Sequence, residues 1–479
     1  MKKTYVFLLI LLVLAVGSVS AIGSIVYEQR DDVTIREYVI YGDKSAAEGI
    51  TVVNQTHMRY HLFWETTYHV GEKPLCETNY KFVSRGEEIE QKYVYYGIDV
   101  QDDVGYYYSG RENPVDMQKE YDALYNTLEK GETKSKNIYI KEYYDYYPIR
   151  MNINLPNTVW VNNDPETEVG DNPYDPKYVI NKFQEFFKIP VLETDFVRIT
   201  VSKAKDSPNS NISYSEERSA EQNYYQVGSV SAHTDKVCYF AINNKSMKYK
   251  YSDDGYNKET CDGEYVDTSL IPGGYGIYSF SYGRGAGEYH TGIDADSLQM
   301  VFSLEQDVSV KHMMMRKNQN QLVLLTEEDE GAFVRIIDLA SMKEVQQIRL
   351  DDTLYNQFGR YANIFAYEDF FVIVYGENIA VISEENGVYV HEFTVPVKAN
   401  ESCYFPNTMS NAYSISIDFD GEKLAIVGMQ GERFGYNTCD YCLLVYDASG
   451  LFYFGEYLTG MSKYDCDPVL VDTYHVSWQ

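Results

Sequence analysis

Three short, fully apolar runs recur in the C-terminal part of the sequence: Leu322-Val323-Leu324-Leu325, Phe371-Val372-Ile373-Val374 and Leu424-Ala425-Ile426-Val427. They begin 49 and 53 residues apart, and each follows a polar turn. A continuous apolar run between two turn signals is typical of a strand that is buried on both faces. The near-constant spacing indicates a structural repeat, because periods of about 20–50 residues mark stacked units.

A hairpin is predicted after each apolar run. The second hairpin turns at Asn386-Gly387, a strong type I′ signal because both residues tolerate positive φ angles. The paired strands are expected at 334–339 with 345–350, 378–383 with 388–395, and 443–447 with 451–458. A β-propeller blade is a four-stranded antiparallel unit of about this length. We therefore predict that the three apolar runs are equivalent inner strands of successive blades.

Two stretches carry a family resemblance. The sequence Asp-Phe-Asp-Gly-Glu-Lys-Leu-Ala at 418–425 resembles the turn of TolB-like propeller repeats. The sequence Ile-Asp-Leu-Ala-Ser-Met-Lys-Glu-Val at 337–345 resembles the hairpin of many bacterial propeller blades. The resemblance to TolB-like and WD-type repeats covers mainly residues 297–460, without the Gly-His and Trp-Asp signatures of true WD repeats. It implies an architecture and no particular activity, because such folds host many functions.

We therefore predict an all-β chain. It is expected to be a β-propeller of six to eight four-stranded blades with helical insertions, preceded by an N-terminal signal or anchor segment. Regular blades are expected over 297–479, and irregular, insertion-rich blades over 28–296. Asn113-Pro114 and Asp175-Pro176 are helix start signals, and they predict helices near 114–130 and 176–188. Further strands are predicted at 58–70, 79–83, 237–243 and 276–282.

The N-terminal stretch predicts export. Lys2 and Lys3 precede an apolar run, and Val19-Ser20-Ala21 supplies the small residues of a cleavage site. We therefore expect residues 1–21 to be a signal peptide. Residues 4–27 are also long enough to span a bilayer, which needs about 20 residues, so a membrane anchor is the alternative. In that alternative the lysines stay inside and the bulk of the chain lies outside.

The composition excludes several classes of protein. The chain has 72 Asp and Glu against 41 Lys and Arg, which gives a net charge of −31. Nucleic acid is not expected as a partner, because proteins that bind it need a basic surface for the phosphates. With 44% hydrophobic residues, the chain is neither wholly disordered nor a multi-span membrane protein. The acid excess disfavours polyanions, so a neutral or cationic ligand is expected.

Tyrosine is unusually frequent, with 48 residues against 3 Trp. Two clusters lie in the irregular half of the chain, where insertions from the blades are expected. Tyrosine forms rigid, amphipathic binding surfaces. We therefore predict that these clusters bind a glycan or peptide: Tyr106, Tyr107, Tyr108, Tyr143, Tyr144, Tyr146 and Tyr147. The alternative is that these side chains fill half-buried strand positions.

Seven cysteines are present, and an exported chain permits disulfides. Cys439 and Cys442 have C-x-x-C spacing, but they precede a predicted strand and not a helix N-terminus, which would lower a thiol pKa. An odd total leaves at least one thiol outside an intramolecular disulfide. We predict at least one disulfide, with four candidates in the same terminal region: Cys403, Cys439, Cys442 and Cys466.

The sequence does not assign catalytic residues. It holds no nucleophile elbow, phosphate-binding loop or dinucleotide fingerprint. No metal ligands and no cofactor are predicted, although the acidic clusters leave calcium as an alternative. We expect an exported, non-enzymatic propeller that binds or scaffolds a protein, peptide or glycan outside the cytoplasm. Two alternatives stay open: an extracellular propeller enzyme acting on polysaccharide, and a membrane-tethered sensor domain.

Overall fold

The computed structural model divides the chain into two compact units. Unit 1 comprises Met1–Tyr93, Asp369–Glu384 and His391–Gln479, and unit 2 comprises Val94–Glu368 and Glu385–Val390. The structure describes residues 2–58, 62–80, 97–102, 117–146, 149–158, 161–162, 173–185, 191, 193, 195–204, 212–218, 229–242, 245–251, 258–265, 274–286, 290–316, 320–350, 362–375, 378–397, 415–429, 440–459 and 469–478.

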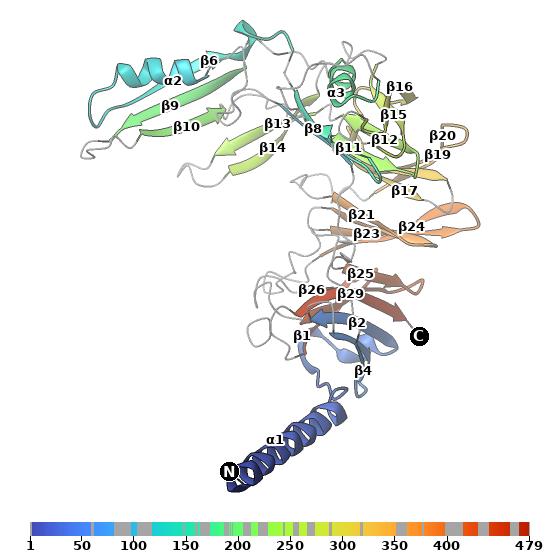
Figure 1. The fold of residues 1–479 in the computed structure, drawn as a ribbon. Coiled ribbons are helices and arrows are strands. Elements are labelled where there is room, and N and C mark those ends of the chain that lie inside the picture. The colour runs from blue at the N-terminus through green and yellow to red at the C-terminus, as the bar shows by residue number, and fades with distance from the viewer. Residues whose placement is uncertain are drawn as a thin grey trace. The chain divides into compact units, whose positions relative to one another are not determined.

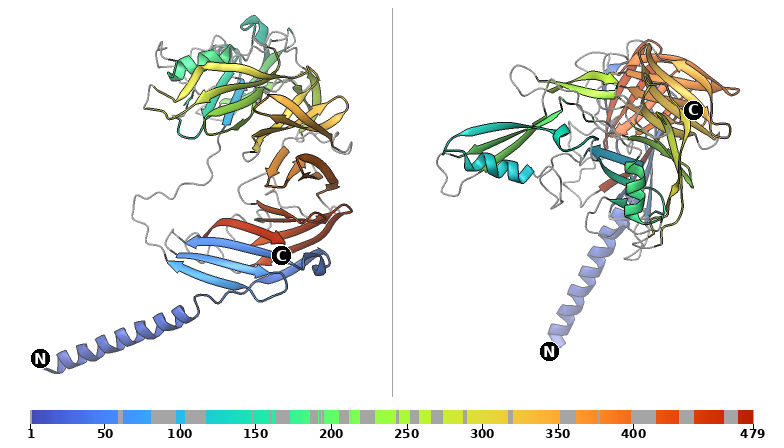
Figure 2. Two further views of the ribbon diagram at one scale, coloured as in Figure 1. Left: turned by 90° about the vertical axis from the view of Figure 1, so that its right-hand side faces the viewer. Right: turned by 90° about the horizontal axis from the view of Figure 1, so that it is seen from above.

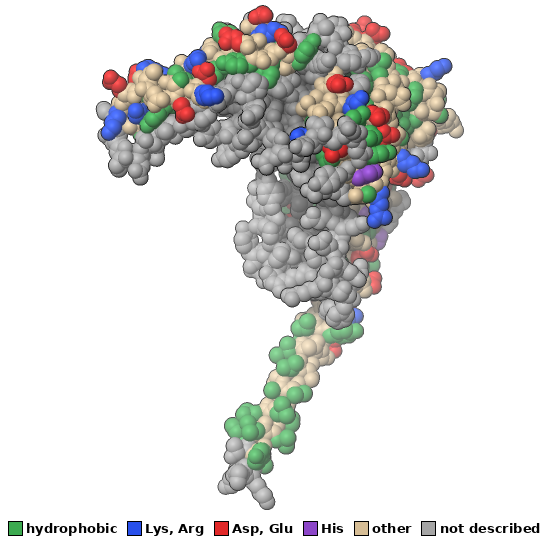
Figure 3. All heavy atoms as spheres, turned by 45° about the horizontal axis from the view of Figure 1, so that its top comes forward, with side chains coloured by type: hydrophobic (Ala, Val, Ile, Leu, Met, Phe, Trp, Pro, Cys, Tyr) green, Lys and Arg blue, Asp and Glu red, His purple; other side chains and the backbone are tan. Residues whose placement is uncertain are grey.

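The N-terminal segment is one uninterrupted helix, α1 (Lys2–Glu28). Its apolar side chains are exposed along its whole length (Figure 3). The part from Tyr5 to Glu28 is long and apolar enough to cross a membrane. A cleaved signal and a retained anchor both have these properties, so the helix agrees with either prediction.

In unit 1, strands from the two ends of the sequence share one sheet. β29 (Val469–Trp478) pairs antiparallel with β2 (Ile50–Met58), and β3 (Leu62–His69) and β4 (Leu75–Tyr80) follow in order. Figure 2 shows the first strands, in blue, beside the last strands, in red. A propeller joins its last blade to its first by pairing of this kind.

The second sheet of unit 1 also contains an N-terminal strand. Its order is β25 (Ile415–Phe419), β26 (Leu424–Met429), β27 (Tyr441–Asp447), β28 (Gly450–Leu458) and β1 (Arg36–Gly42). β1 therefore adds a fifth strand to a four-stranded blade. It ends at Gly42, which has a φ of 76°, and a Cβ there would lie 1.9 Å from the carbonyl oxygen of Phe452. No residue with a side chain fits this approach without moving the backbone.

Unit 2 contains three further sheets of the blade type among the described residues. They are β5 (Gly97–Asp102), β7 (Ile149–Asn154) and β8 (Val161–Asn162); β11 (Ser229–His233), β12 (Val237–Ile242), β15 (Gly276–Tyr282) and β16 (Ile293–Ser303); and β17 (Ser309–Arg316), β18 (Gln321–Glu328), β19 (Gly331–Asp338) and β20 (Lys343–Arg349). The first strands of these sheets, β5, β11 and β17, lie next to one another in that order, as the innermost strands of consecutive blades do.

The three apolar runs occupy equivalent positions, as predicted. They lie in β18, in β22 (Phe370–Tyr375) and in β26, each of which is the second strand of its sheet. The sheet that contains β22 has the order β21 (Ala362–Ala366), β22, β23 (Asn378–Glu385) and β24 (Val388–Pro396). Leu322, Leu324 and Leu325 are fully buried, because neighbouring strands cover both edges and packed side chains cover both faces. The innermost strand is the one before each run, and the β-propeller fold is confirmed.

The predicted hairpins are also present. Asn386 and Gly387 have φ angles of 53° and 81°, which are the values of a type I′ turn, and they connect β23 to β24. β19 and β20 are joined through residues 339–342, and β27 and β28 through Ala448 and Ser449. These turns fix the register of the outer strands in the regular blades.

One prediction about the N-terminal strands is wrong. Residues 58–70 do not form a single strand, because β2 ends at Met58 and β3 begins at Leu62. The next strand, β4, covers 75–80 where 79–83 was expected. Polar Asn54 and Gln55 interrupt the apolar pattern of β2, so the alternation did not reveal this strand. His57 and His69 consequently lie on two different strands, and the ring of His69 bonds to Thr51 Oγ1 at 2.7 Å.

The insertions in unit 2 contain both predicted helices, each shorter than expected. α2 (Met117–Asn126) packs on a sheet with the order β10 (Ile212–Arg218), β9 (Phe196–Lys203) and β6 (Thr133–Tyr139) (Figure 1). The N-cap of α3 (Pro176–Gln184) is Asp175, whose side chain accepts a hydrogen bond from the backbone N–H of Lys177 at 2.9 Å. β13 (Lys245–Tyr251) and β14 (Lys258–Tyr265) form a separate hairpin.

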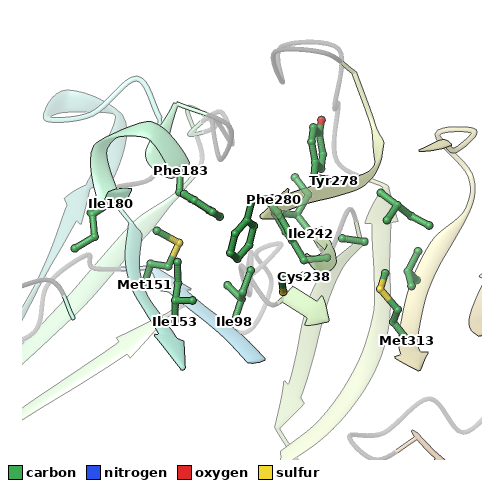
Figure 4. Close-up of a cluster of buried hydrophobic side chains, with 14 of the residues drawn as sticks. Ile98, Met151, Ile153, Ile180, Phe183, Cys238, Ile242, Tyr278, Phe280 and Met313 are labelled. Atoms are coloured by element: carbon green, nitrogen blue, oxygen red, sulfur yellow. The ribbon is translucent and has the colours of Figure 1, made fainter. Parts of the chain in front are cut away.

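The core of unit 2 joins α3 to the blades. Phe183 of α3 is fully buried, and its ring lies edge-on to Phe280 of β15 at 5.0 Å. Figure 4 shows Met151 and Ile153 of β7 and Ile98 of β5 beside these rings. The apolar face of α3 is therefore a packing surface.

Candidate ligand-binding site

The structure separates the predicted tyrosines by exposure. Tyr143 and Tyr146 are 38% and 39% exposed, whereas Tyr144 is partly buried against the core of unit 2. Tyr106, Tyr107, Tyr108 and Tyr147 lie outside the described residues. Tyr139, which the sequence did not single out, is 42% exposed and lies four residues before Tyr143.

Several tyrosines within the blades differ from these, because they are buried. Tyr441 and Tyr457 stack with ring centroids 5.0 Å apart in the core of unit 1. In unit 2, burial raises the pKa of Tyr278 to about 12. The alternative interpretation, in which tyrosine fills strand positions, therefore applies to the blade tyrosines. It does not apply to the exposed tyrosines that follow β6.

The exposed tyrosines lie on a short, locally bonded segment. β6 leads directly into a 3-10 turn, η2 (Ile140–Glu142), and the backbone N–H groups of Tyr143 and Tyr144 both donate to the carbonyl of Ile140 at 3.0 Å. Ile140 is buried and fixes this turn to the core. The turn thus presents Tyr143 on a segment that is anchored on both sides.

The sheet that precedes this turn has one covered and one open face. Val197, Ile199 and Val201 of β9 are buried on the face that α2 covers. Side chains alternate along a strand, so the intervening residues lie on the opposite face. We call this second surface the β6–β9 face, and it consists of Thr133, Ser135, Asn137 and Tyr139 of β6 with Phe196, Arg198, Thr200 and Ser202 of β9.

Every cross-strand pair on the β6–β9 face is in contact. The hydroxyl groups of Thr133 and Ser202 lie 2.8 Å apart, as do those of Ser135 and Thr200. The next pair is joined by Arg198 Nε, which donates to Asn137 Oδ1 at 3.0 Å. The last pair is aromatic, with the rings of Tyr139 and Phe196 at 5.8 Å.

These contacts form an ordered series along the strands. Hydroxyl pairs occupy one end of the face and an aromatic pair occupies the other. The guanidinium of Arg198 lies between them, 5.6 Å from the ring centroid of Phe196. Because each polar group is already held by its neighbour, the face is preorganised for a ligand that needs both hydrogen bonds and a stacking surface.

The charge of this region differs from that of the whole chain. Residues 117–146, 195–204 and 212–218 contain eight Lys or Arg and nine Asp or Glu, so this lobe is nearly neutral in a chain of net charge −31. The β6–β9 face carries one cation, Arg198, and no Asp, Glu, His or Cys. Within the described ranges, no group of three or more His, Cys, Asp or Glu is placed to hold a metal ion. The arrangement suits the binding of a neutral molecule.

The structure also locates three of the seven thiols. Cys76, Cys238 and Cys442 are free. Cys442 points at the carbonyl of Gly428 in the neighbouring strand, 3.3 Å away, and burial raises its pKa to about 12. The prediction that included Cys442 among the disulfide candidates is therefore not met, because its sulfur is enclosed within a sheet. Cys403, Cys439 and Cys466 lie outside the described residues, so a disulfide among them stays a prediction.

Comparisons with known proteins identify no family for the chain. No family model matches it, and no curated protein matches it. Among solved structures, it is similar to Hsv2 of Kluyvelomyces marxianus, with 13% identity and a TM-score of 0.18 over 43% of this chain and 62% of that one. It is also similar to the Cps50 (Swd1) β-propeller domain of Myceliophteria thermophila, with 9% identity and a TM-score of 0.22 over 56% and 71%.

A nidogen/laminin complex is a third similar structure, with 8% identity and a TM-score of 0.20 over 59% of this chain and 94% of that one. All three TM-scores lie below 0.5. The fold is therefore assigned from the strand order and the repeated runs described above, and the site from its own residues.

Proposed function

We propose that this protein is an exported, non-enzymatic β-propeller that binds a neutral glycan on the β6–β9 face and the adjoining tyrosines. The observation that carries the proposal is the exposure of Tyr139, Tyr143 and Tyr146 beside the polar side chains of the β6–β9 face, whereas Tyr278, Tyr441 and Tyr457 of the blades are buried. Exposed aromatic side chains next to polar groups on a rigid support are typical of a binding surface.

The chemistry of the face favours a sugar. A sugar ring has an apolar C–H face, which stacks on aromatic rings such as those of Tyr139 and Phe196. Its hydroxyl groups both donate and accept, as do the hydroxyls of Thr133 and Ser135. The nearly neutral lobe neither attracts nor repels an uncharged ligand, whereas the net charge of −31 disfavours polyanions.

The composition of the face also favours binding over hydrolysis. Glycosidases commonly use two carboxyl groups, one on each side of the scissile bond. The eight residues of the β6–β9 face include no carboxyl group, and the third strand, β10, adds one to the same side of the sheet, Glu217, in register with Arg198. A ligand held there would leave the site unchanged, as expected of a binding or scaffolding module.

The test is a glycan and peptide array probed with the full chain in detergent. The proposal expects retention on neutral glycans and a loss of at least tenfold in the variant Tyr143→Ala/Tyr146→Ala. Tyr38→Ala is the matched control, because Tyr38 is 48% exposed on a different sheet. Equal retention by both variants, retention on peptides alone, or release of reducing ends from a bound polysaccharide would contradict the proposal.

A further inference from the structure

We infer that α1 stays on the chain as a single membrane span, and that the residues after it hold the sheet β29–β2–β3–β4 with its β4 edge at the bilayer surface. This inference concerns a lipid surface and is independent of the glycan proposal. It rests on the length of α1, on the side chains at its end, and on the contacts of the next two residues.

The length of α1 fits a bilayer. The apolar part from Tyr5 to Glu28 has 24 residues. At 1.5 Å per residue it extends about 36 Å, and the hydrocarbon core of a bilayer is about 30 Å thick. The helix continues through Val19-Ser20-Ala21, where cleavage was predicted, without a change in conformation.

The C-terminal end of α1 has the residues of a membrane interface. Tyr27 is a residue type that gathers at the boundary between lipid and water. The guanidinium of Arg30 lies 3.7 Å from the ring centroid of Tyr27 and donates to its carbonyl at 3.3 Å. An arginine in this position reaches the headgroups, so the span ends at this pair.

The charges on either side of the span set its direction. The four residues before the apolar part include Lys2 and Lys3, whereas the four residues after it include one basic residue, Arg30, and Arg36 and Lys44 follow at a greater distance. The side with more Lys and Arg stays in the cytoplasm. The residues that follow α1 therefore lie on the opposite side of the membrane.

The residues directly after the helix are bound to β4. The hydroxyl of Thr78 donates to the carbonyl of Arg30 at 2.8 Å, and the backbone N–H of Thr78 donates to Asp31 Oδ1 at 2.9 Å. Among the described residues β4 is an edge strand, and the N–H of Thr78 points away from β3 to Asp31. Asp31 takes the place of a neighbouring strand there and covers part of the edge.

These bonds bring β4 close to the bilayer. Only Gln29 separates the end of α1 from Arg30. A chain of three residues spans at most about 10 Å and the hydrogen bond adds 2.8 Å, so the hydroxyl of Thr78 lies within about 13 Å of the end of the span. Leu75, at the start of β4, is 64% exposed. Transfer of an exposed leucine from water into the bilayer interface is favourable in free energy, because its apolar surface is removed from water.

The experiment places a photoreactive benzoylphenylalanine at residue 75 of the full chain, expressed in cells, and measures lipid adducts by mass after irradiation. Residue 475 is the matched control, because His475 is exposed on β29 at the opposite edge of the same sheet. Three strand spacings separate the two edges, about 14 Å. The inference expects at least fivefold more lipid adduct at residue 75 than at residue 475.

A second comparison tests the docking contacts. Asp31→Ala/Thr78→Val removes both hydrogen bonds, and the chain should stay in the membrane fraction while the adduct at residue 75 falls at least fivefold. Asp32→Ala is the control, because it removes a nearby carboxylate that does not bond to Thr78. It should change the amount of lipid adduct at residue 75 less than twofold. Three results would overturn the inference: a mature N-terminus at Ile22, equal adducts at residues 75 and 475, or no effect of the double substitution.

Discussion

The phenol of Tyr453 donates a hydrogen bond of 3.1 Å to the carboxylate of Glu37, a residue 416 positions earlier in the chain. The same carboxylate accepts from Tyr68 at 3.1 Å and from Lys44 Nζ at 2.5 Å. Tyr453 and Tyr457 are also hydrogen-bonded, at 2.9 Å. Burial raises the pKa of both phenols, so they remain protonated. Glu37 therefore links β1, β3 and β28, and with them the two ends of the sequence.

Replacing Glu37 should destabilise unit 1. Glu37→Ala removes the acceptor of three donors, two of which are phenols in the core, and should lower the free energy of unfolding by about 3 kcal/mol. Chemical denaturation of the full chain measures this change. Glu72→Ala is the control, because Glu72 is exposed, and it should change the free energy by less than about 0.5 kcal/mol. Equal values for the two variants would show that Glu37 does not hold the ends together.

The part of the fold that the sequence predicted depends on local pattern. In β18, β22 and β26 the four residues of each run are all buried, so the runs are apolar throughout and their positions could be identified. β1 could not be assigned, because its partner, β28, lies more than 400 residues away, and β2 was missed because Asn54 and Gln55 interrupt its apolar pattern. Strand partners at that separation leave no periodic signal in a single sequence. A propeller must join its last blade to its first, but the sequence did not show which strands do so.

Removal of the N-cap of α3 should destabilise the protein less than Glu37→Ala does. Asp175→Ala leaves the N–H of Lys177 without its side-chain acceptor and should lower the free energy of unfolding by about 1 kcal/mol. Asp175→Asn should retain most of the stability, since Asn also caps helices. Asp235→Ala, at an exposed turn position, serves as the control. A loss for Asp175→Asn as large as that for Asp175→Ala would argue against a capping role.

His312 should make unit 2 less stable in acid. Burial lowers its pKa to about 4, and its Nδ1 has no hydrogen-bond partner among the described residues. The ordinary pKa is 6.5, so between pH 6.5 and 4 the unfolded chain binds more protons than the folded chain, and stability falls as the pH falls. The loss is at most about 3 kcal/mol, because a tenfold difference in proton affinity corresponds to 1.36 kcal/mol.

The measurement for His312 is the free energy of unfolding at pH 7 and pH 4.5. The variant His312→Gln has no proton to gain at this position, so it should lose less stability than the wild type over this range. His475→Gln should retain the wild-type dependence. An unchanged pH dependence in His312→Gln would place the acid sensitivity elsewhere.

Thiol titration under denaturing conditions, without reductant, should find three to five free thiols. Cys76, Cys238 and Cys442 are free in the structure, and the predicted disulfide removes two of the remaining four. The protein should be harvested from outside the cytoplasm for this measurement. Seven free thiols would rule out the disulfide, and fewer than three would contradict the free state of these three residues.

The sequence predicted part of the candidate site. The density of tyrosine pointed to Tyr143 and Tyr146, which are exposed. Phe196 and Arg198 were missed, because the β6–β9 face arises only when strands more than 50 residues apart pair. The sequence of β9 did contain a pattern that predicts an exposed face. Val197, Ile199 and Val201 alternate with polar or aromatic residues, as in a half-exposed strand.

The most direct test of the binding proposal compares two substitutions on opposite faces of β6. Tyr139 lies on the β6–β9 face, whereas Lys136 lies on the covered side and pairs with Glu120 of α2 at 2.5 Å. The measured quantity is the dissociation constant of the full chain for the neutral glycan that it retains. Tyr139→Ala should weaken binding about tenfold, because a stacking contact contributes about 1 kcal/mol beyond the area that it buries. Lys136→Ala should leave the constant within twofold of the wild type, and equal weakening by both substitutions would contradict a site on this face.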